Sequence, residues 1–171
     1  TGIAGDDAEV LDAISEASAI VDAEAGARSQ LLSALSQGLE RQGEHRRAEE
    51  LSVQALALAR ESGSDEALYF ALNARWVISL CDAPLDYRRA LVREMIEIGQ
   101  AARSEKLVCA AIHFGGMDGI EGGDRHDFEE TSEQLRQSDA SSLWLFDMTV
   151  RSYPWRQAFL ALLDGRWDDA A

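Results

Sequence analysis

The feature that most constrains the fold of this chain is a turn that recurs about every forty residues. The turns fall at Gly43, Ala83, Gly123 and Gly165, at spacings of 40, 40 and 42 residues. Each turn follows one apolar helical stretch and precedes another. A pair of helices cannot bury its apolar face alone, so successive pairs must stack on one another. The period therefore predicts an all-α chain built as an α-solenoid of antiparallel helix hairpins.

The helix that follows each turn carries a stripe of apolar residues. After Gly43, the segment EHRRAEELSVQALALARESG places alanine and leucine at spacings of three and four, which is one face of a helix. Forty residues later, YRRALVREMIEIGQAAR repeats the pattern. The residues five positions after the turns are Ala48, Arg88, Phe128 and Ala170. Arg88 interrupts this otherwise apolar column, and Ala90 restores it two residues further on.

The pattern predicts about eight helices in one domain that spans residues 1–171. Neither Pro84 nor Pro154 lies in a stretch with the composition of a linker, so no internal boundary is expected. Pro154 falls inside the last predicted helix, where its ring and its missing N–H predict a break near Ser152 to Trp155. The expected helices are residues 6–23, 27–42, 44–61, 65–81, 86–103, 106–121, 124–138 and 141–164.

Both ends of the chain have the sequence of an interrupted hairpin. The apolar residues Val10, Ile14, Ala17 and Val21 predict the second helix of a preceding pair. The residues after Gly165 stop within the first turn of another helix. Because arrays of this kind normally end in helices with a polar outer face, we expect the chain to be a fragment of a larger protein.

A net charge of −15 argues against some classes of partner. Acidic residues are spread along the whole length and repel phosphate groups, so direct binding of nucleic acid is not expected. No run of about 18 apolar residues occurs, and the first residues lack a basic segment followed by an apolar one, so neither membrane anchoring nor export is expected. Cys81 and Cys109 form no paired pattern, which predicts a reducing cytoplasm.

Two parts of the sequence resemble known helical repeats. The stretch GEHRRAEELSVQALALARESGSDEAL resembles a tetratricopeptide repeat (TPR), with Gly43 at the turn and the small Ala48 and Ala55 where helices touch. YFALNARWVISLCDAPLDYRRALVREMIEIG and ALLDGRWDDAA look like the divergent TPR-like region of large bacterial signalling ATPases. These include the large ATP-binding LuxR-type transcriptional regulators and relatives with cyclase domains. The resemblance covers residues 27–171.

The resemblance implies a context for the chain. In that family a P-loop ATPase module precedes the helical array, a helix-turn-helix follows it in the regulators, and the array senses an inducer or mediates self-association. The resemblance therefore implies a non-catalytic regulatory domain that binds a protein partner or a small-molecule or peptide effector. The alternative is a free-standing TPR-like adaptor or homo-oligomerisation module, whose incomplete hairpins are completed by a second copy.

Candidate binding residues are predicted on the first helix of each hairpin, which in TPR-like arrays faces a concave groove. Counting back ten and six residues from the turns gives the candidate groove residues Ser33, Asn73, His113, Trp155, Gln37, Val77, Met117 and Phe159. Their amide, imidazole, thioether and aromatic groups suit a peptide, a helix or a small inducer. For His113 and Met117, the alternative is that they only fill space between helices.

Two further groups of residues have alternative interpretations. The four tryptophans could anchor a partner, but the apolar surroundings of Trp76 and Trp144 predict that these two pack in the core. Arg41, Arg46 and Arg47 form a basic cluster around the first turn, which could pair with carboxylates of a neighbouring chain or be a solvated turn.

No catalytic, cofactor or metal site is predicted. The sequence has no GxxxxGK[ST] motif for a P-loop, and the glycines of HFGGMDGIEGGD are expected to serve close helix packing and a turn. Asp124, His126, Asp127 and Glu130 have the spacing of metal ligands, but no second histidine or cysteine cluster completes a site. Capping of a helix start explains the two aspartates instead. An enzyme centred on this cluster is the third interpretation of the chain.

Overall fold

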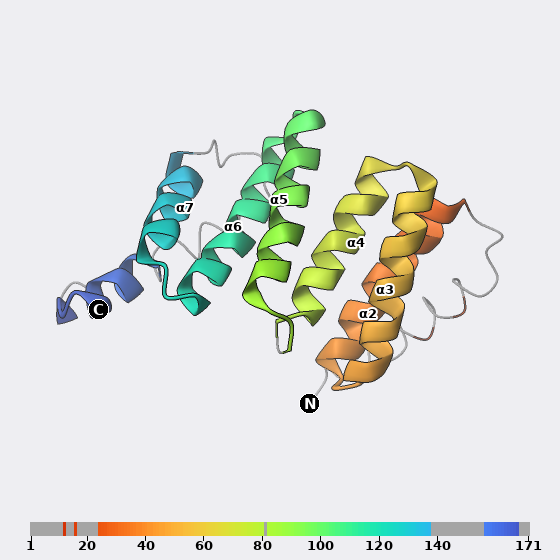
Figure 1. Ribbon diagram of the computed structural model, residues 1–171, viewed down its shortest axis with the longest axis horizontal. Helices are drawn as coiled ribbons and strands as arrows, with labels where there is room; N and C mark the ends of the chain where they lie inside the picture. The colour runs from red at the N-terminus through yellow and green to blue at the C-terminus, as the bar shows by residue number, and fades with distance from the viewer. Residues whose placement is uncertain (1–11, 13–15, 17–23, 81, 138–155, 168–171) are drawn as a thin grey trace. The chain divides into compact units, whose positions relative to one another are not determined.

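The computed structural model describes residues 12, 16, 24–80, 82–137 and 156–167. Within these residues the structure consists of helices and turns and contains no strand, so the all-α prediction is confirmed. Residues 156–163 are helical. The labelled helices of Figure 1 are α2 (Ala25–Arg41), α3 (His45–Ser62), α4 (Asp65–Ile78), α5 (Leu85–Ala101), α6 (Glu105–Glu121) and α7 (Arg125–Gln137).

Most predicted helix boundaries agree with the structure to within two residues. The exception is the helix predicted to reach residue 81, because α4 ends at Ile78. Pro84 lies six residues further on, where it disfavours helical backbone at Ala83 and is well suited to the start of α5 at Leu85. The predicted helix 6–23, the predicted break near Pro154 and the first part of the predicted helix 141–164 lie outside the described residues.

Local sequence explains where several helices begin. The hydroxyl of Ser64 accepts a hydrogen bond from the backbone N–H of Ala67 at the start of α4, and Ser104 does the same for Leu107 at the start of α6. Such N-caps satisfy N–H groups that have no partner within the helix. Asp65 follows Ser64 in the first turn of α4, where its negative charge is favoured by the helix dipole.

The chain divides into two compact units, residues 1–94 (unit 1) and 95–171 (unit 2), and the division falls within α5. In unit 1, α2 contacts both α3 and α4, and α3 also contacts α4. Figure 1 shows these three helices side by side. Trp76 is 2% exposed, so its predicted place in the core is confirmed. The buried side chains shared by these helices include Leu32, Leu35, Leu39, Ala48, Ala55, Leu56, Leu72 and Ile78.

Unit 2 has a smaller described core, built on α6, α7 and residues 156–163. Helix α6 contacts α7, and the Phe128 ring of α7 meets the Phe159 ring edge to face, with centroids 5.7 Å apart. The predicted packing role of the glycines in α6 is confirmed at Gly119, where a Cβ atom would lie 3.2 Å from that of Asp127. Other buried side chains of this unit are Cys109, Ala110, Ala111, Phe114, Leu160 and Ala161.

The predicted turns at Gly43, Gly123 and Gly165 share one backbone conformation. Their φ angles are +82°, +68° and +70°. In each turn, the N–H after the glycine donates to a carbonyl five residues earlier, at 3.0 Å, 2.8 Å and 2.8 Å respectively. This is the Schellman ending of a helix. At Ala83, the second of the four predicted turns, the backbone N–H instead donates to the Ser79 carbonyl, so this turn is built differently.

Replacing Gly43 by alanine should destabilise unit 1 by about 1 kcal/mol, because an L-residue is strained at positive φ. No atom lies within 4 Å of the Cβ position, so this cost is conformational rather than steric. Gly26→Ala is the matched control. Its Cβ would make ordinary contacts of 3.6 Å with Ser62, and alanine favours the helix by up to about 1 kcal/mol. Urea unfolding should therefore shift in opposite directions for the two variants. If Gly43→Ala leaves the free energy of unfolding unchanged, this explanation of the turn is wrong.

Candidate functional site

In unit 1, the structure brings two predicted groove residues together. Gln37 on α2 donates from Nε2 to Oδ1 of Asn73 on α4, over 3.2 Å, and both side chains are half-buried. Val77, one turn beyond Asn73, is also half-buried. Ser33 is buried instead and donates its hydroxyl to the Ser29 carbonyl of its own helix. An amide pair therefore joins the first helices of consecutive hairpins.

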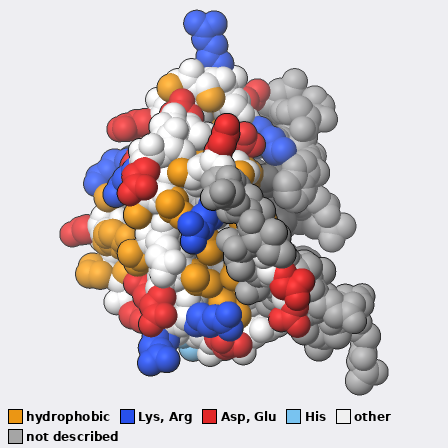
Figure 2. Space-filling model, turned by 90° about the vertical axis from the view of Figure 1, so that its right-hand side faces the viewer, with side chains coloured by type: hydrophobic (Ala, Val, Ile, Leu, Met, Phe, Trp, Pro, Cys, Tyr) orange, Lys and Arg blue, Asp and Glu red, His pale blue; other side chains and the backbone are white. Residues whose placement is uncertain are grey.

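Hydrophobic side chains are accessible on the surface of unit 1 as well. Phe70 on α4 is 45% exposed and Val53 on α3 is 52% exposed. Figure 2, which views the molecule from the side of α2 and α3, shows hydrophobic side chains open to solvent among acidic and basic ones. Phe70 lies three residues before Asn73 on α4, so it shares a side of that helix with the amide pair.

In unit 2, the predicted groove residues have different surroundings. His113 on α6 is half-buried, and its Nδ1 lies 3.4 Å from Nη2 of Arg156. Met117 is 37% exposed. Phe159 is half-buried against Phe128, as described above. The remaining predicted residue, Trp155, lies outside the described residues.

Three arginines among the described residues are buried, which the sequence did not predict, and two of them, Arg75 and Arg156, contact serines. Arg75 on α4 donates from Nη1 to the hydroxyl of Ser52, over 3.0 Å. Arg156 donates from Nη1 to the hydroxyl of Ser132, over 3.1 Å. Ser52 and Ser132 each stand nine residues after a turn glycine, at Gly43 and Gly123. We call these two pairs the serine–arginine clamps. The serine that recurs nine residues after a turn glycine is the feature of the sequence from which they could have been predicted.

The clamp of unit 1 is neutralised by a carboxylate. Arg75 also donates to Glu49 and, from Nε, to the Tyr87 hydroxyl over 3.2 Å. Its guanidinium lies 5.6 Å from the centre of the Tyr87 ring, where a cation is attracted by the π face. Burial disfavours the charge, but the hydrogen bonds to Glu49 and Tyr87 outweigh it and raise the pKa of Arg75. Arg75 therefore stays charged.

The clamp of unit 2 has a different electrostatic environment. Arg156 is 0% exposed, and burial lowers its pKa to about 10. Its Nη2 donates to the backbone carbonyl of His113 over 3.0 Å, and the guanidinium lies 4.9 Å from the centre of the Phe128 ring. A Cβ atom at Gly116 would come within 2.6 Å of both Nη atoms, so the absence of a side chain there makes room for Arg156.

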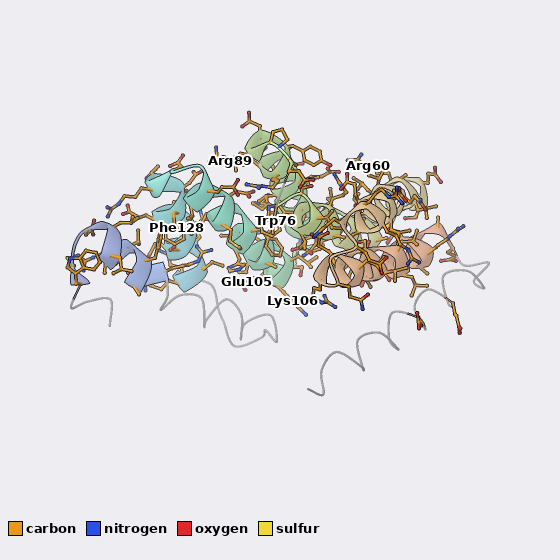
Figure 3. All side chains as sticks on the ribbon, turned by 90° about the horizontal axis from the view of Figure 1, so that it is seen from below. Arg60, Trp76, Arg89, Glu105, Lys106 and Phe128 are labelled. Atoms are coloured by element: carbon orange, nitrogen blue, oxygen red, sulfur yellow. The ribbon has the colours of Figure 1, made fainter. Side chains whose placement is uncertain are left out.

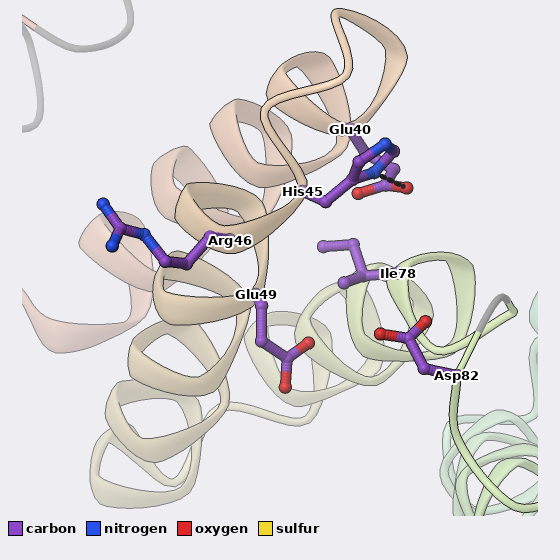
Figure 4. A pocket seen from close by; sticks show the side chains of 6 residues that line it. All are labelled: Glu40, His45, Arg46, Glu49, Ile78 and Asp82. Carbon is purple, nitrogen blue, oxygen red and sulfur yellow. Dashed lines mark hydrogen bonds and ion pairs between the residues drawn. The ribbon is translucent and has the colours of Figure 1, made fainter.

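An open pocket lies at one end of unit 1, where α2, α3 and α4 meet (Figure 4). Its volume is about 410 Å³. Nδ1 of His45 and Oε1 of Glu40 are 2.8 Å apart on its wall. Three carboxylates against one guanidinium and one imidazole make the described lining of this pocket predominantly acidic. The lining residues are Glu40, His45, Arg46, Glu49, Ile78 and Asp82.

The proposed capping role of Asp124 is confirmed. Its Oδ1 accepts a hydrogen bond of 3.0 Å from the backbone N–H of Asp127 at the start of α7, and His126 is exposed. Among the residues that the structure describes, no group of three or more histidine, cysteine, aspartate or glutamate side chains has the arrangement of a metal site. In that same part of the chain, no helix has the length and apolar character needed to cross a membrane.

Comparison of the chain with known proteins gives no match among protein-family models, curated proteins or solved structures. The fold and the surfaces described above therefore define the class of the protein only as all-α.

Proposed function

We propose that this chain is a TPR-like helical array that binds a partner or effector through the first helices of its hairpins. The observation that carries the proposal is the contact between α2 and α4, across which Gln37 donates to Asn73. Two consecutive first helices thus form one surface with half-buried amides and the accessible Phe70 beside them. Amide groups next to an aromatic ring suit a peptide or a small organic effector.

The proposed context is a bacterial signalling ATPase, in particular a large ATP-binding LuxR-type transcriptional regulator. The forty-residue period and the resemblance of residues 27–171 to the helical region of that family support this proposal. In such a protein the array is non-catalytic and cytoplasmic, and does not itself bind nucleic acid or membrane. Ligand binding regulates the attached modules because it favours one packing of neighbouring hairpins over another.

A site-specific photo-crosslinker tests the proposed surface. We would place it at position 70 of the protein expressed in its own cells and, as a matched control, at the similarly exposed position 53 on α3. The proposal predicts one dominant adduct at position 70, which the Gln37→Ala/Asn73→Ala double variant loses although it stays folded by circular dichroism. Equal labelling from both positions, or labelling that survives the double variant, would show that the surface is not the binding site.

A homo-oligomerisation module is the second candidate, and a different observation favours it. Leu162, Leu163 and Trp167 are 42%, 56% and 70% exposed, so three large apolar side chains lie open within six residues. Exposed apolar groups of this kind are typical of contact surfaces. Light scattering should give twice the chain mass of 18.7 kDa if this candidate is right, and Leu163→Asp should restore the single mass. A single mass for the unmodified chain at high concentration excludes the candidate.

A further inference from the structure

The buried position of the Arg156 side chain in unit 2 depends on the protonation state of one neighbouring residue. Its side chain is held by the Ser132 hydroxyl, the His113 carbonyl and the Phe128 ring, and Gly116 leaves the space for it. The imidazole of His113 adds a further contact, because its Nδ1 faces Nη2 of Arg156 at 3.4 Å. Of these groups, His113 is the one whose charge changes in mildly acidic solution.

The geometry requires a neutral imidazole. A guanidinium only donates hydrogen bonds, so Nδ1 of His113 faces Arg156 as an acceptor and cannot carry a proton there. Protonation of Nδ1 would point an N–H at Arg156 and place two positive charges within 3.4 Å of each other in a buried setting. Burial and the charge of Arg156 accordingly lower the pKa of His113 from 6.5 to about 4.

The described groups that face this contact come from α6 and α7. Helix α7 faces Arg156 with the hydroxyls of Thr131 and Ser132. On α6, the buried Asp118 lies five residues beyond His113, which is roughly 140° around the helix. Arg156 is the charged group whose field acts on His113. In unit 1 the corresponding Arg75 is paired with Glu49 and faces no histidine among its described contacts.

We propose that the His113–Arg156 contact is an acid-sensitive latch, which holds residues 156–163 against α6 and α7 and opens when His113 is protonated. When the latch is open, the guanidinium of Arg156 no longer contacts the ring of His113, which is a predicted groove residue of this unit. The latch rests on contacts within unit 2 and is independent of what binds to unit 1.

The direction of the pH effect follows from linkage. The pKa of His113 is lower in the closed state, at about 4, than its ordinary value of 6.5, so the open state binds more protons between these two values. The latch is therefore fully stabilised above pH 6.5 and weakens as the pH falls towards 4. Between pH 7 and pH 5 the opening equilibrium should rise on the order of 20-fold from this group alone.

Hydrogen exchange of the unmodified full chain at pH 7 and pH 5, corrected for the intrinsic pH dependence, tests the latch. We expect amides of α6 and of residues 156–163 to lose protection on the order of 20-fold, while amides of α2 to α4 change much less. If neither group of amides changes its protection between pH 7 and pH 5, the proposal is wrong, and this result needs no variant protein.

Two asparagine variants separate the latch from general acid effects. His113→Asn keeps an acceptor near the position of Nδ1 but cannot be protonated, so the selective loss of protection should disappear even if this variant is less stable at pH 7. His126→Asn, at an exposed position on α7, should leave the loss unchanged. If His113→Asn retains the full pH response, His113 is not the group that opens unit 2.

Discussion

Replacement of Trp76 by alanine should lower the free energy of unfolding of unit 1 by about 3–5 kcal/mol. The side chain is 2% exposed on α4, the helix that contacts both α2 and α3, and Figure 3 shows it within the side chains of this unit. Loss of the indole removes apolar burial and leaves a cavity that close-packed helices cannot fill. Because a domain is stable by only about 5–15 kcal/mol, this loss is a large fraction of the stability of unit 1. Urea unfolding followed by circular dichroism measures the loss.

Phe70→Ala is the matched control for Trp76→Ala, because both aromatic residues lie on α4. The Phe70 side chain is 45% exposed, so its loss should cost less than about 1 kcal/mol. If the two variants are equally destabilised, Trp76 does not have the core position described above. If Phe70→Ala is neutral for stability but no longer binds the partner that crosslinking identifies, the core and the binding surface of α4 are separate.

The corresponding substitution in unit 2 is Phe128→Ala, which should cost about 3–5 kcal/mol. Phe128 is 1% exposed and is labelled on α7 in Figure 3. Its ring supports both Phe159 and the guanidinium of Arg156. The variant therefore loses an aromatic contact and a cation–π contact besides apolar burial. Protection of α6 and α7 amides from hydrogen exchange reports this loss directly.

Two controls make the Phe128 prediction specific. Phe128→Leu keeps most of the volume and should cost less than Phe128→Ala, with the remaining cost assigned to the lost ring contacts. Trp167→Ala removes an aromatic side chain that is 70% exposed and should change stability by no more than about 0.5 kcal/mol. Equal effects of Phe128→Ala and Trp167→Ala would contradict the packing of unit 2 described here.

The parts of the fold that the sequence predicted are those that a local pattern controls. The turn glycines were found because positive φ favours glycine and because three of them recur at a fixed interval. The helices were found because their apolar residues repeat with the helical period. The end of α4 was misjudged by three residues because apolar residues continue in the sequence beyond Ile78, so periodicity alone does not mark where the helix ends.

The buried arginines were missed because composition and periodicity treat arginine as a surface residue. Arg88, which interrupts an apolar column in the sequence, is 0% exposed and donates to the Leu80 carbonyl over 3.1 Å. Arg156 is equally buried and depends on Gly116, forty residues earlier, for its space. Apart from the serines that recur nine residues after Gly43 and Gly123, such residues are identified by the groups that surround them, and these come from other parts of the chain.

The sequence predicted some of the candidate groove residues but not the side chains that surround them. The count from the turns placed Gln37 six residues before its turn and Asn73 ten residues before the next one, so it did not pair them, and the structure shows that they meet. The same count could not show that Ser33 turns inward to its own backbone or that a guanidinium reaches His113. A repeat period fixes the height of a residue along its helix, whereas the neighbouring side chains decide what remains accessible.

Reading the coding sequence on both sides of this segment in its source genome tests the central proposal most directly. A regulatory array of a signalling ATPase predicts a P-loop ATPase module upstream of Thr1 and a helix-turn-helix or cyclase domain downstream of Ala171. A start codon and a stop codon at these two positions would contradict that proposal and would leave a free-standing helical adaptor.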